Sequence, residues 1–244
     1  MLGLIALVHV CQTQGQTPAT SQAKALNLVL AEFPPYAYHD GEKLTGLSLQ
    51  LVTPVFEAMQ LKPNYKLVPS YARATRQVSS GKADGMLLAS QNSERDAIAH
   101  FSLPLIMNRW SWFFATSHPL SSKHLAFKEV AKIGSVFSSN THKWLVKHEY
   151  KVSATPTLAL ALPRLLHATD RINAVFLSEA VFYRATQQSG LPRGDFVQEV
   201  ESVRPFGIYI AKKTVKRYPK LLDRLNAQIR QHYPTPALTP LKIK

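Results

Sequence analysis

The alternation of apolar runs with amphipathic stretches between residues 26 and 89 restricts the fold of this chain more than any other feature. We expect β-strands at 26–31, 65–68 and 85–89, where β-prone apolar residues cluster. Apolar residues recur every four positions from Leu47 to Met59, which is typical of a helix packed on a sheet, and residues 71–80 form a second helix. This strand–helix order predicts parallel strands joined by right-handed crossovers.

A second set of alternating elements follows a β-prone run at 110–115. We expect further strands at 132–137, 151–154, 173–177 and 206–211, and helices at 141–148, 157–168, 179–189 and 218–233. A chain of 244 residues, 45% of them hydrophobic, is long enough for two domains of about 100–120 residues each. The sequence therefore predicts two similar α/β halves.

Polar residues gather where the predicted strands end. They are Ser90 and Arg95 after the third strand, and Ser139, Asn140, Ser178 and Glu179 after strands of the second half. Ligands in open α/β sheets bind outside the carboxyl ends of the strands. The sequence therefore predicts that a ligand would bind at these strand ends.

The N-terminus combines a short apolar run, MLGLIALVHVC, with a polar, uncharged stretch, TQGQTPATSQ. This pattern predicts a signal peptide and leader over residues 1–23, cleaved between Cys11 and Ala23, with a buried first strand as the alternative. Cys11 is the only cysteine, so the mature chain would offer no disulfide and no cysteine nucleophile or metal ligand. A cysteine-free mature chain suits an oxidising periplasm.

The chain is strongly basic, with a net charge of +14. Residues 204–244 hold ten Lys and Arg against one acid, Asp223. This region is a solvated helix face, or else a surface that attracts polyanions or an anionic membrane. Nucleic acid is not an expected partner, because no nucleic-acid-binding motif accompanies the charge.

Catalytic and metal-binding motifs are absent from the sequence. There is no H-E-x-x-H pair, no G-x-S-x-G turn and no G-x-x-x-x-G-K-[ST] phosphate loop. No cofactor, metal or catalytic activity is therefore expected. No stretch reaches the ~18 apolar residues that a membrane-spanning helix needs.

Five segments occur in order from Leu26 to Tyr233: PPYAYHDGEKLTGLSLQLV, SGKADGMLLAS, NSERDAIAHFSLPL, RINAVFLSEAVFYRA and FGIYIAKK. Together they resemble the periplasmic solute-binding proteins of the polar amino-acid ABC transporter type (bacterial extracellular solute-binding proteins, family 3), as a divergent branch. The resemblance implies a type II periplasmic-binding-protein-like α/β fold. In that fold, two lobes, each a mixed sheet flanked by helices, are joined by two hinge strands and close on a ligand.

The resemblance also implies how the chain divides. Lobe one would comprise residues 24–113 and 204–233, lobe two residues 114–203, and a loose tail residues 234–244. The hinges would lie near Phe113–Ser117 and Val203–Phe206. A monomer is the default for this fold.

By the same resemblance, Ser90 and Arg95 would bind a ligand carboxylate, whose two oxygens match the guanidinium fork. A surface position for Arg95 is the alternative. Tyr36 would cover the ligand. Ser139 and Asn140 would offer donors at a helix N-terminus, where each is also a helix-capping residue.

The sequence departs from the family pattern where the family has an aspartate that holds the ligand's ammonium group. Ser178 stands there, so either Glu179 takes that role or the ligand lacks a standard α-amino group. Glu32 and the segment that contains Arg73 resemble a divergent branch of the family. Both residues are candidates to line the site, or else they are surface charges. Trp112 is expected in hinge packing or in the cleft wall.

The expected function is that of a secreted, periplasmic protein that captures a small polar or anionic ligand, amino-acid-like or a carboxylate, for uptake or sensing. Its partner would be an inner-membrane permease or a sensor protein. One alternative is a dehydratase-like enzyme on the same fold, with Glu32 or Glu179 as general acid and base. Another is a polyanion or membrane-surface binder that uses the basic C-terminal region.

Overall fold

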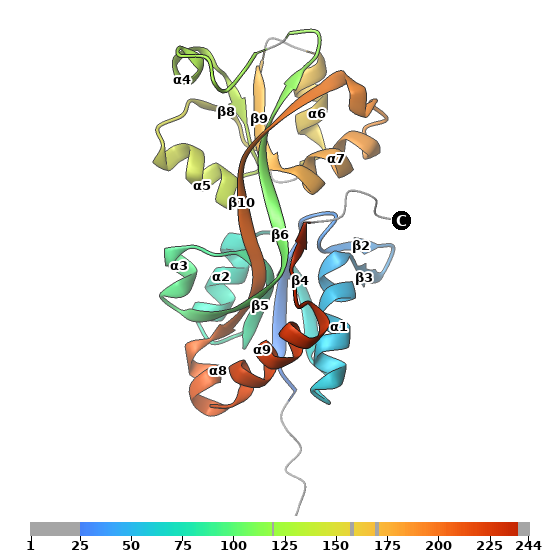
Figure 1. Ribbon diagram of the computed structural model, residues 1–244, viewed down its shortest axis with the longest axis vertical. Helices are drawn as coiled ribbons and strands as arrows, with labels where there is room; N and C mark the ends of the chain where they lie inside the picture. Colours follow the sequence, from blue (N-terminus) through green and yellow to red (C-terminus); the bar gives the residue numbers. More distant parts are fainter. Residues whose placement is uncertain (1–24, 119, 157–158, 169–170, 239–244) are drawn as a thin grey trace, which may run out of the picture.

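A computed structural model describes residues 25–118, 120–156, 159–168 and 171–238. The predicted leader, residues 1–23, lies outside the described residues. The molecule has two lobes, one above the other, joined by two long strands that run through both (Figure 1). No helix in the described part of the chain is long and apolar enough to cross a membrane.

Lobe one is built on three parallel strands. They are β1 (Asn27–Ala31), β4 (Asn64–Val68) and β5 (Gly85–Ser90), in the order β4-β1-β5. Its helices are α1 (Leu47–Ala58), α2 (Tyr71–Ser79), α3 (Ser93–Asp96), α8 (Lys212–Arg217) and α9 (Leu221–His232). A hairpin of β2 (Tyr38–Asp40) and β3 (Lys43–Thr45) extends from the lobe. The parallel pairing predicted from the sequence is confirmed.

The helices of lobe one form because each buries one apolar face. In α1 the buried residues include Leu47, Val52, Val55 and Phe56, and α1 packs beside α9. Helix α2 packs against β1 and β5. Its N-terminus is capped by Ser70, whose hydroxyl accepts a hydrogen bond from the backbone of Arg73 at 3.3 Å.

Lobe two repeats the parallel arrangement. Its strands are β7 (Ile133–Gly134), β8 (Val152–Ala154) and β9 (Ala174–Ser178), in the order β9-β7-β8. Its helices are α4 (Phe127–Val130), α5 (Asn140–Lys147), α6 (Ala161–Ala168), α7 (Glu179–Gln188) and the short 3-10 helix η1 (Arg193–Asp195). The strand predicted at 132–137 is shorter than expected because the chain leaves the sheet after Gly134.

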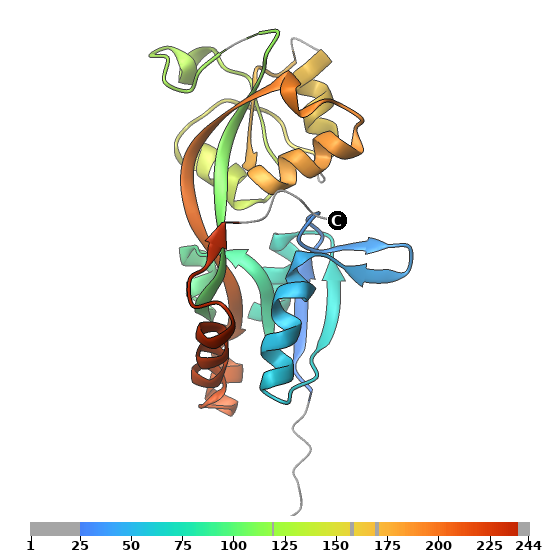
Figure 2. The same cartoon turned by 45° about the vertical axis from the view of Figure 1, so that its right-hand side comes forward.

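Two long antiparallel strands, β6 (Ala99–Ala115) and β10 (Phe196–Ala211), connect the lobes and join their strands into one sheet. Figure 2 shows them side by side from one lobe to the other. Strand β10 pairs with β5 in lobe one, and β6 pairs with β9 in lobe two at 110–113. The runs predicted at 110–115 and 206–211 are therefore the ends of much longer strands.

The register places the crossing in β6 earlier than the hinge expected at Phe113–Ser117. Residues 110–113 pair with β9, so the pairing with the sheet of lobe two begins before the expected hinge. The expected second hinge, Val203–Phe206, pairs with residues 106–109 of β6, and we place the crossing there. The lobe limits at 113 and 203 stay a prediction.

The C-terminal segment is not entirely the loose tail expected for 234–244. Ala237 and Leu238 form a short strand, β11, that pairs in parallel with Ile106 and Met107 of β6. Residues 239–244 lie outside the described residues. The end of the described chain is therefore attached to the segment where β6 crosses between the lobes.

The apolar interior has two parts. A large cluster fills lobe one and continues into lobe two beneath α6 and α7. A second, aromatic cluster in lobe two contains Trp110, Trp112, Phe114, Phe127 and Phe176. Trp112 is buried there with its ring centroid 4.4 Å from that of Phe176, so it belongs to the core of lobe two rather than to the hinge or the cleft wall.

Candidate functional site

A small cavity lies between the lobes among the described residues, and we call it the interlobe cavity. It is lined by Phe33, Tyr71, Ser90, Arg95, Asn108, Trp110, Ser139, Asn140, Thr141, Ser178 and Phe206. Its volume is about 20 Å³. That is room for about one water molecule, so the lobes must part to admit a larger ligand.

Arg95 is the only charged residue among those that line the cavity. Its side chain is 2% exposed, and its guanidinium carbon lies 4.9 Å from the ring centroid of Tyr71. Its Nη1 donates a hydrogen bond to the backbone oxygen of Ser90 at 2.7 Å. Asn92 holds the turn before it by accepting a hydrogen bond from the backbone of Arg95 at 2.9 Å.

The Nε of Arg95 is buried and has no hydrogen-bond partner within the part of the chain that the structure describes. Among the described residues, no carboxylate forms an ion pair with this guanidinium. Burial lowers the pKa of Arg95, and Tyr71 is foremost among the groups that oppose this shift. A buried cation of this kind is strongly stabilised by an anion that accepts its free hydrogen bond.

Tyr36 lies beside the cavity and is 1% exposed. Its hydroxyl donates to Oδ1 of Asn108 at 3.3 Å and lies 3.2 Å from the hydroxyl of Ser178. Ser178 also donates to Oδ1 of Asn108 at 2.7 Å. Tyr36 of lobe one, Ser178 of lobe two and Asn108 of the crossing strand thus form one buried polar cluster.

Helix α5 directs its N-terminus at the cavity. Ser139 caps the helix by accepting a hydrogen bond from the backbone of His142 at 3.1 Å, and its hydroxyl lies 2.8 Å from that of Thr141. The positive end of the helix dipole favours a negative charge at this place.

Polar contacts join the lobes around the cavity. Asn140 donates from Nδ2 to the backbone oxygen of Ser90 at 3.1 Å and accepts from Asn92 at 2.8 Å. Lys143 of α5 forms an exposed ion pair with Glu94 of α3. These contacts hold lobe two against the turn that carries Arg95.

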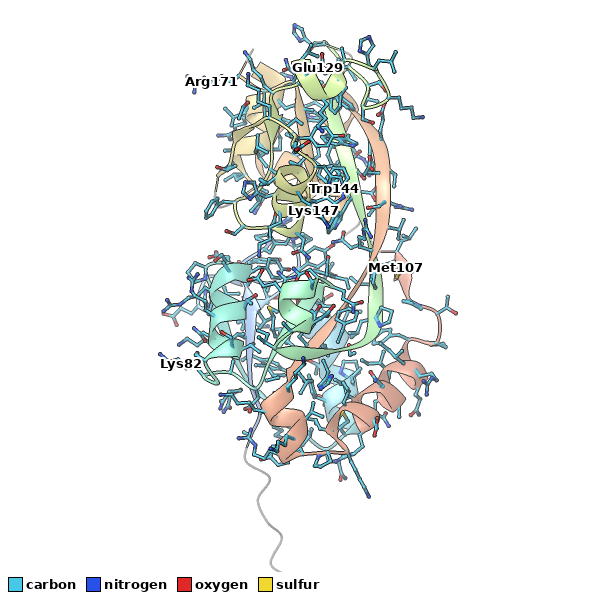
Figure 3. All side chains as sticks on the ribbon, turned by 90° about the vertical axis from the view of Figure 1, so that its left-hand side faces the viewer. Lys82, Met107, Glu129, Trp144, Lys147 and Arg171 are labelled. Atoms are coloured by element: carbon cyan, nitrogen blue, oxygen red, sulfur yellow. The ribbon has the colours of Figure 1, made fainter. Side chains whose placement is uncertain are left out.

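A larger groove of about 400 Å³ adjoins the cavity, sharing Trp110 and Asn140 with it; we call it the mouth groove. It is lined by Gln91, Asn92, Ser93, Glu94, Trp110, Asn140, Lys143, Trp144, Lys147 and Arg204. Figure 3 shows Trp144 and Lys147 at the edge of lobe two that faces lobe one, and Met107 on the strand between the lobes.

The structure thus brings together several of the residues that the sequence singled out. Ser90, Arg95, Ser139, Asn140 and Ser178 line the cavity and Tyr36 lies beside it. Their roles toward a ligand stay a prediction.

Three other candidates do not line the cavity. Glu179 is buried, and its Oε2 forms an ion pair with Nη1 of Arg109 at 2.8 Å. Arg73 is exposed on α2 and lines a different groove, with Asn27 and Lys82. Glu32 follows β1, where its backbone donates to Val68.

Six further lining residues were not singled out from the sequence. Trp110 lines both the cavity and the mouth groove, and the other five line the cavity: Phe33, Tyr71, Asn108, Thr141 and Phe206. Asn108, Trp110 and Phe206 belong to the long crossing strands. The polar Asn108, which directly follows the apolar run 103–107, was an available signal. No group of three or more His, Cys, Asp or Glu in the described residues is placed to hold a metal ion.

Comparisons with known proteins agree with this architecture. A search of the curated proteins found no match. Among solved structures, a histidine kinase sensor domain with similarity to periplasmic binding proteins has a TM-score of 0.74 at 15% identity, over 86% of this chain and 91% of that one.

An ancestral arginine-binding protein bound to arginine has a TM-score of 0.69 at 20% identity, over 86% of this chain and 92% of that one. A substrate-binding protein of an ABC uptake transporter from Streptococcus pneumoniae with bound histidine has a TM-score of 0.70 at 15% identity, over 86% of this chain and 87% of that one. At these identities the likeness shows the fold alone, and it confirms the expected two-lobed periplasmic-binding-protein fold.

The family model described as bacterial extracellular solute-binding proteins, family 3, matches residues 27–242. This range includes both lobes, the crossing strands and every residue of the interlobe cavity. The match confirms the resemblance drawn from the sequence. The chain therefore belongs to the bacterial extracellular solute-binding proteins of family 3.

Proposed function

We propose that this protein captures a small carboxylate between its two lobes, with Arg95 as the anchor. Membership of a family of solute-binding proteins makes it a ligand-binding protein for uptake or sensing. That function fits the comparisons better than a dehydratase-like enzyme or a polyanion binder does. The family and the similar structures are solute-binding proteins and a sensor domain rather than enzymes.

The observation that carries the proposal is the buried, unpartnered Nε of Arg95 at the cavity. A guanidinium donates two parallel hydrogen bonds to a carboxylate, and such charge-assisted bonds are about twice as strong as neutral ones. The N-terminus of α5 faces the same cavity and would stabilise the same negative charge. Ser90, Ser139 and Asn140 would complete the donor set around the anion.

Tyr36 is proposed to act as a lid side chain that changes partner on binding. Its hydroxyl contacts Asn108 and Ser178 in the closed cavity. A ligand that enters between the lobes would take up one of these hydrogen bonds. We propose contact roles of this kind for Tyr36 and Ser178. We assign none to Glu179, Glu32 and Arg73, whose side chains neither line the cavity nor, among the described residues, form a hydrogen bond with a residue that does.

The family is one of extracellular proteins, and we propose a periplasmic location reached through the leader of residues 1–23. An inner-membrane permease or a sensor protein would receive the loaded form. The similar structures include both an uptake-transporter protein and a sensor domain, so the fold supports either partner.

The test is a thermal-shift screen of the mature chain against carboxylates, amines, amino acids and short peptides. Binding raises stability by RT ln(1 + [L]/Kd), about 2.7 kcal/mol at a hundredfold excess over Kd. A carboxylate that raises Tm in the wild type should have no effect on Arg95→Gln. Lys216→Gln, which removes one positive charge from α8 instead, is the matched control and should respond as the wild type does.

Two outcomes would contradict the proposal. One is a carboxylate shift of equal size in Arg95→Gln and wild type. The other is a shift of Tm that only polyanions give and that both salt and Lys216→Gln abolish. That result would assign binding to the basic C-terminal region.

A further inference from the structure

We propose that the ligand of the interlobe cavity is a carboxylate that carries no ammonium group. The protein would then prefer the des-amino acid over the α-amino acid of the same carbon skeleton. This inference rests on the proposed function and concerns the charge carried on the carbon next to the carboxylate that Arg95 binds.

The cavity contains one cation and no anion. Arg95 is the single charged residue in its lining; the other residues are neutral polar or aromatic side chains. A ligand with one negative charge would balance Arg95. A zwitterion would bring an additional positive charge into a site whose one charged lining residue is already positive.

Two acids that directly follow lining residues in the sequence are paired with other groups. Glu179 follows Ser178 but is paired with Arg109 at 2.8 Å, and its side chain is 7% exposed. Asp96 follows Arg95 but accepts from the hydroxyl of Tyr209 at 2.8 Å. A carboxylate would have to leave its present partner before it met an ammonium group in the cavity.

The remaining acceptors are weak substitutes for a carboxylate. Oδ1 of Asn108 already accepts from Tyr36 and Ser178. The hydroxyls of Ser139 and Thr141 contact each other at 2.8 Å. A buried ammonium with only neutral acceptors keeps most of its desolvation cost, and the positive end of α5 adds repulsion.

The mouth groove, like the cavity, is lined by more positive than negative charges. Three of its lining residues are cations, Lys143, Lys147 and Arg204. Its one acid, Glu94, is paired with Lys143. The indoles of Trp110 and Trp144 offer apolar surface for the rest of the ligand. No acid in either lining is left to receive a cationic end.

Calorimetric titration of the mature protein with matched pairs tests this inference. Suitable pairs are 3-phenylpropanoate with phenylalanine, and glutarate with glutamate, each pair having the same carbon skeleton. We expect Kd for at least one des-amino acid to be tenfold or more below that of its amino acid. An amino acid that binds as tightly as its des-amino partner, with both lost in Arg95→Gln, would overturn the inference and leave the proposed function intact.

A gain-of-function variant provides an independent test. Ser178→Asp introduces a carboxylate at a lining position and should reduce or reverse the preference for the des-amino acid. Ser178→Ala, which removes the same hydroxyl without adding charge, should keep the preference. A folded Ser178→Asp variant with an unchanged ratio of the two affinities would contradict the inference. Binding of both members that is unaffected by Arg95→Gln would instead refute the proposed function.

Discussion

Asn140 at the start of α5 donates a hydrogen bond to the backbone oxygen of Ser90 at the end of β5, across the boundary between the lobes. The same oxygen accepts from Arg95 at 2.7 Å. The bond that holds the lobes together and the bond that positions the proposed anchor therefore share one acceptor. We therefore expect closure and ligand binding to be coupled at this atom.

Asn140→Ala should weaken the closed state, because it removes the bonds to Ser90 and Asn92. Each such bond contributes about 1 kcal/mol, so the closed state loses about 2 kcal/mol and ligand affinity should fall about thirtyfold. Small-angle X-ray scattering should show a larger radius of gyration than in the wild type. Lys143→Met breaks only an exposed ion pair and should change neither quantity much; equal effects of the two variants would contradict the role of Asn140.

The pair Arg109–Glu179 should matter for stability and not for binding. Arg109→Met leaves the buried Glu179 without its partner, which should lower the free energy of unfolding by about 2–4 kcal/mol. The double variant Arg109→Met/Glu179→Gln should recover part of that loss. Urea titration measures both. Loss of ligand affinity in Glu179→Gln, without loss of stability, would show that Glu179 contacts the ligand after all.

Gly46 should tolerate no side chain, because it caps α1 directly against the backbone of Tyr36. A Cβ at this position would lie 2.4 Å from the carbonyl oxygen of Tyr36, and its φ is +121°. Gly46→Ala should cost about 2–4 kcal/mol and weaken ligand binding by displacing Tyr36.

Gly41 is the control for that variant. It also has a positive φ, +59°, but a Cβ at this position would meet no other part of the described chain within 4 Å. Gly41→Ala should cost only about 1–2 kcal/mol of backbone strain and leave affinity unchanged. Equal effects on binding in the two variants would show that the position of Tyr36 does not determine ligand affinity.

Stability should fall at alkaline pH, in part through Tyr71. Burial raises the pKa of Tyr71 above its ordinary value, so the folded protein holds this proton more tightly than the unfolded chain. This contribution is fully present below about pH 10 and is lost as pH rises beyond it. Tyr71→Phe should cost about 1 kcal/mol at pH 7, where it loses the bond to Leu88, yet reduce the alkaline decline.

Urea titrations of wild type and Tyr71→Phe at about pH 8 and pH 11, on either side of the ordinary tyrosine pKa, would measure this difference. Burial also raises the pKa of Tyr209, so some alkaline sensitivity should persist in the variant. Identical losses of stability between the two pH values in both proteins would contradict a buried, proton-retaining Tyr71.

Much of the fold could be predicted because it depends on local patterns. The four-residue spacing from Leu47 and the β-prone runs around Val29 and Leu87 indicated α1, β1 and β5. The long strands were missed over most of their length because Pro104 and Pro205 interrupt the strand pattern, as proline removes a donor from the ladder. Their full extent depends on pairing between segments that lie far apart in the sequence.

The site was predictable where it lies at strand ends, and less so elsewhere. Ser90 ends β5, Arg95 follows it, and Ser139 caps α5, so strand order alone brought them near one another. Asn108 and Trp110 reach the cavity only because β6 passes between the lobes. Glu179 looked suitable from its position beside Ser178, but its pairing with Arg109 depends on tertiary packing.

The most direct measurement is calorimetric titration of the best carboxylate from the screen into wild type, Arg95→Lys and Arg95→Gln. Arg95→Lys keeps the charge but loses the planar fork, so affinity should fall about tenfold or more, and Arg95→Gln should lose about 2–5 kcal/mol of binding free energy. That graded loss, with all three proteins folded, is the expected result. Equal affinity in the three proteins would show that Arg95 does not anchor the ligand.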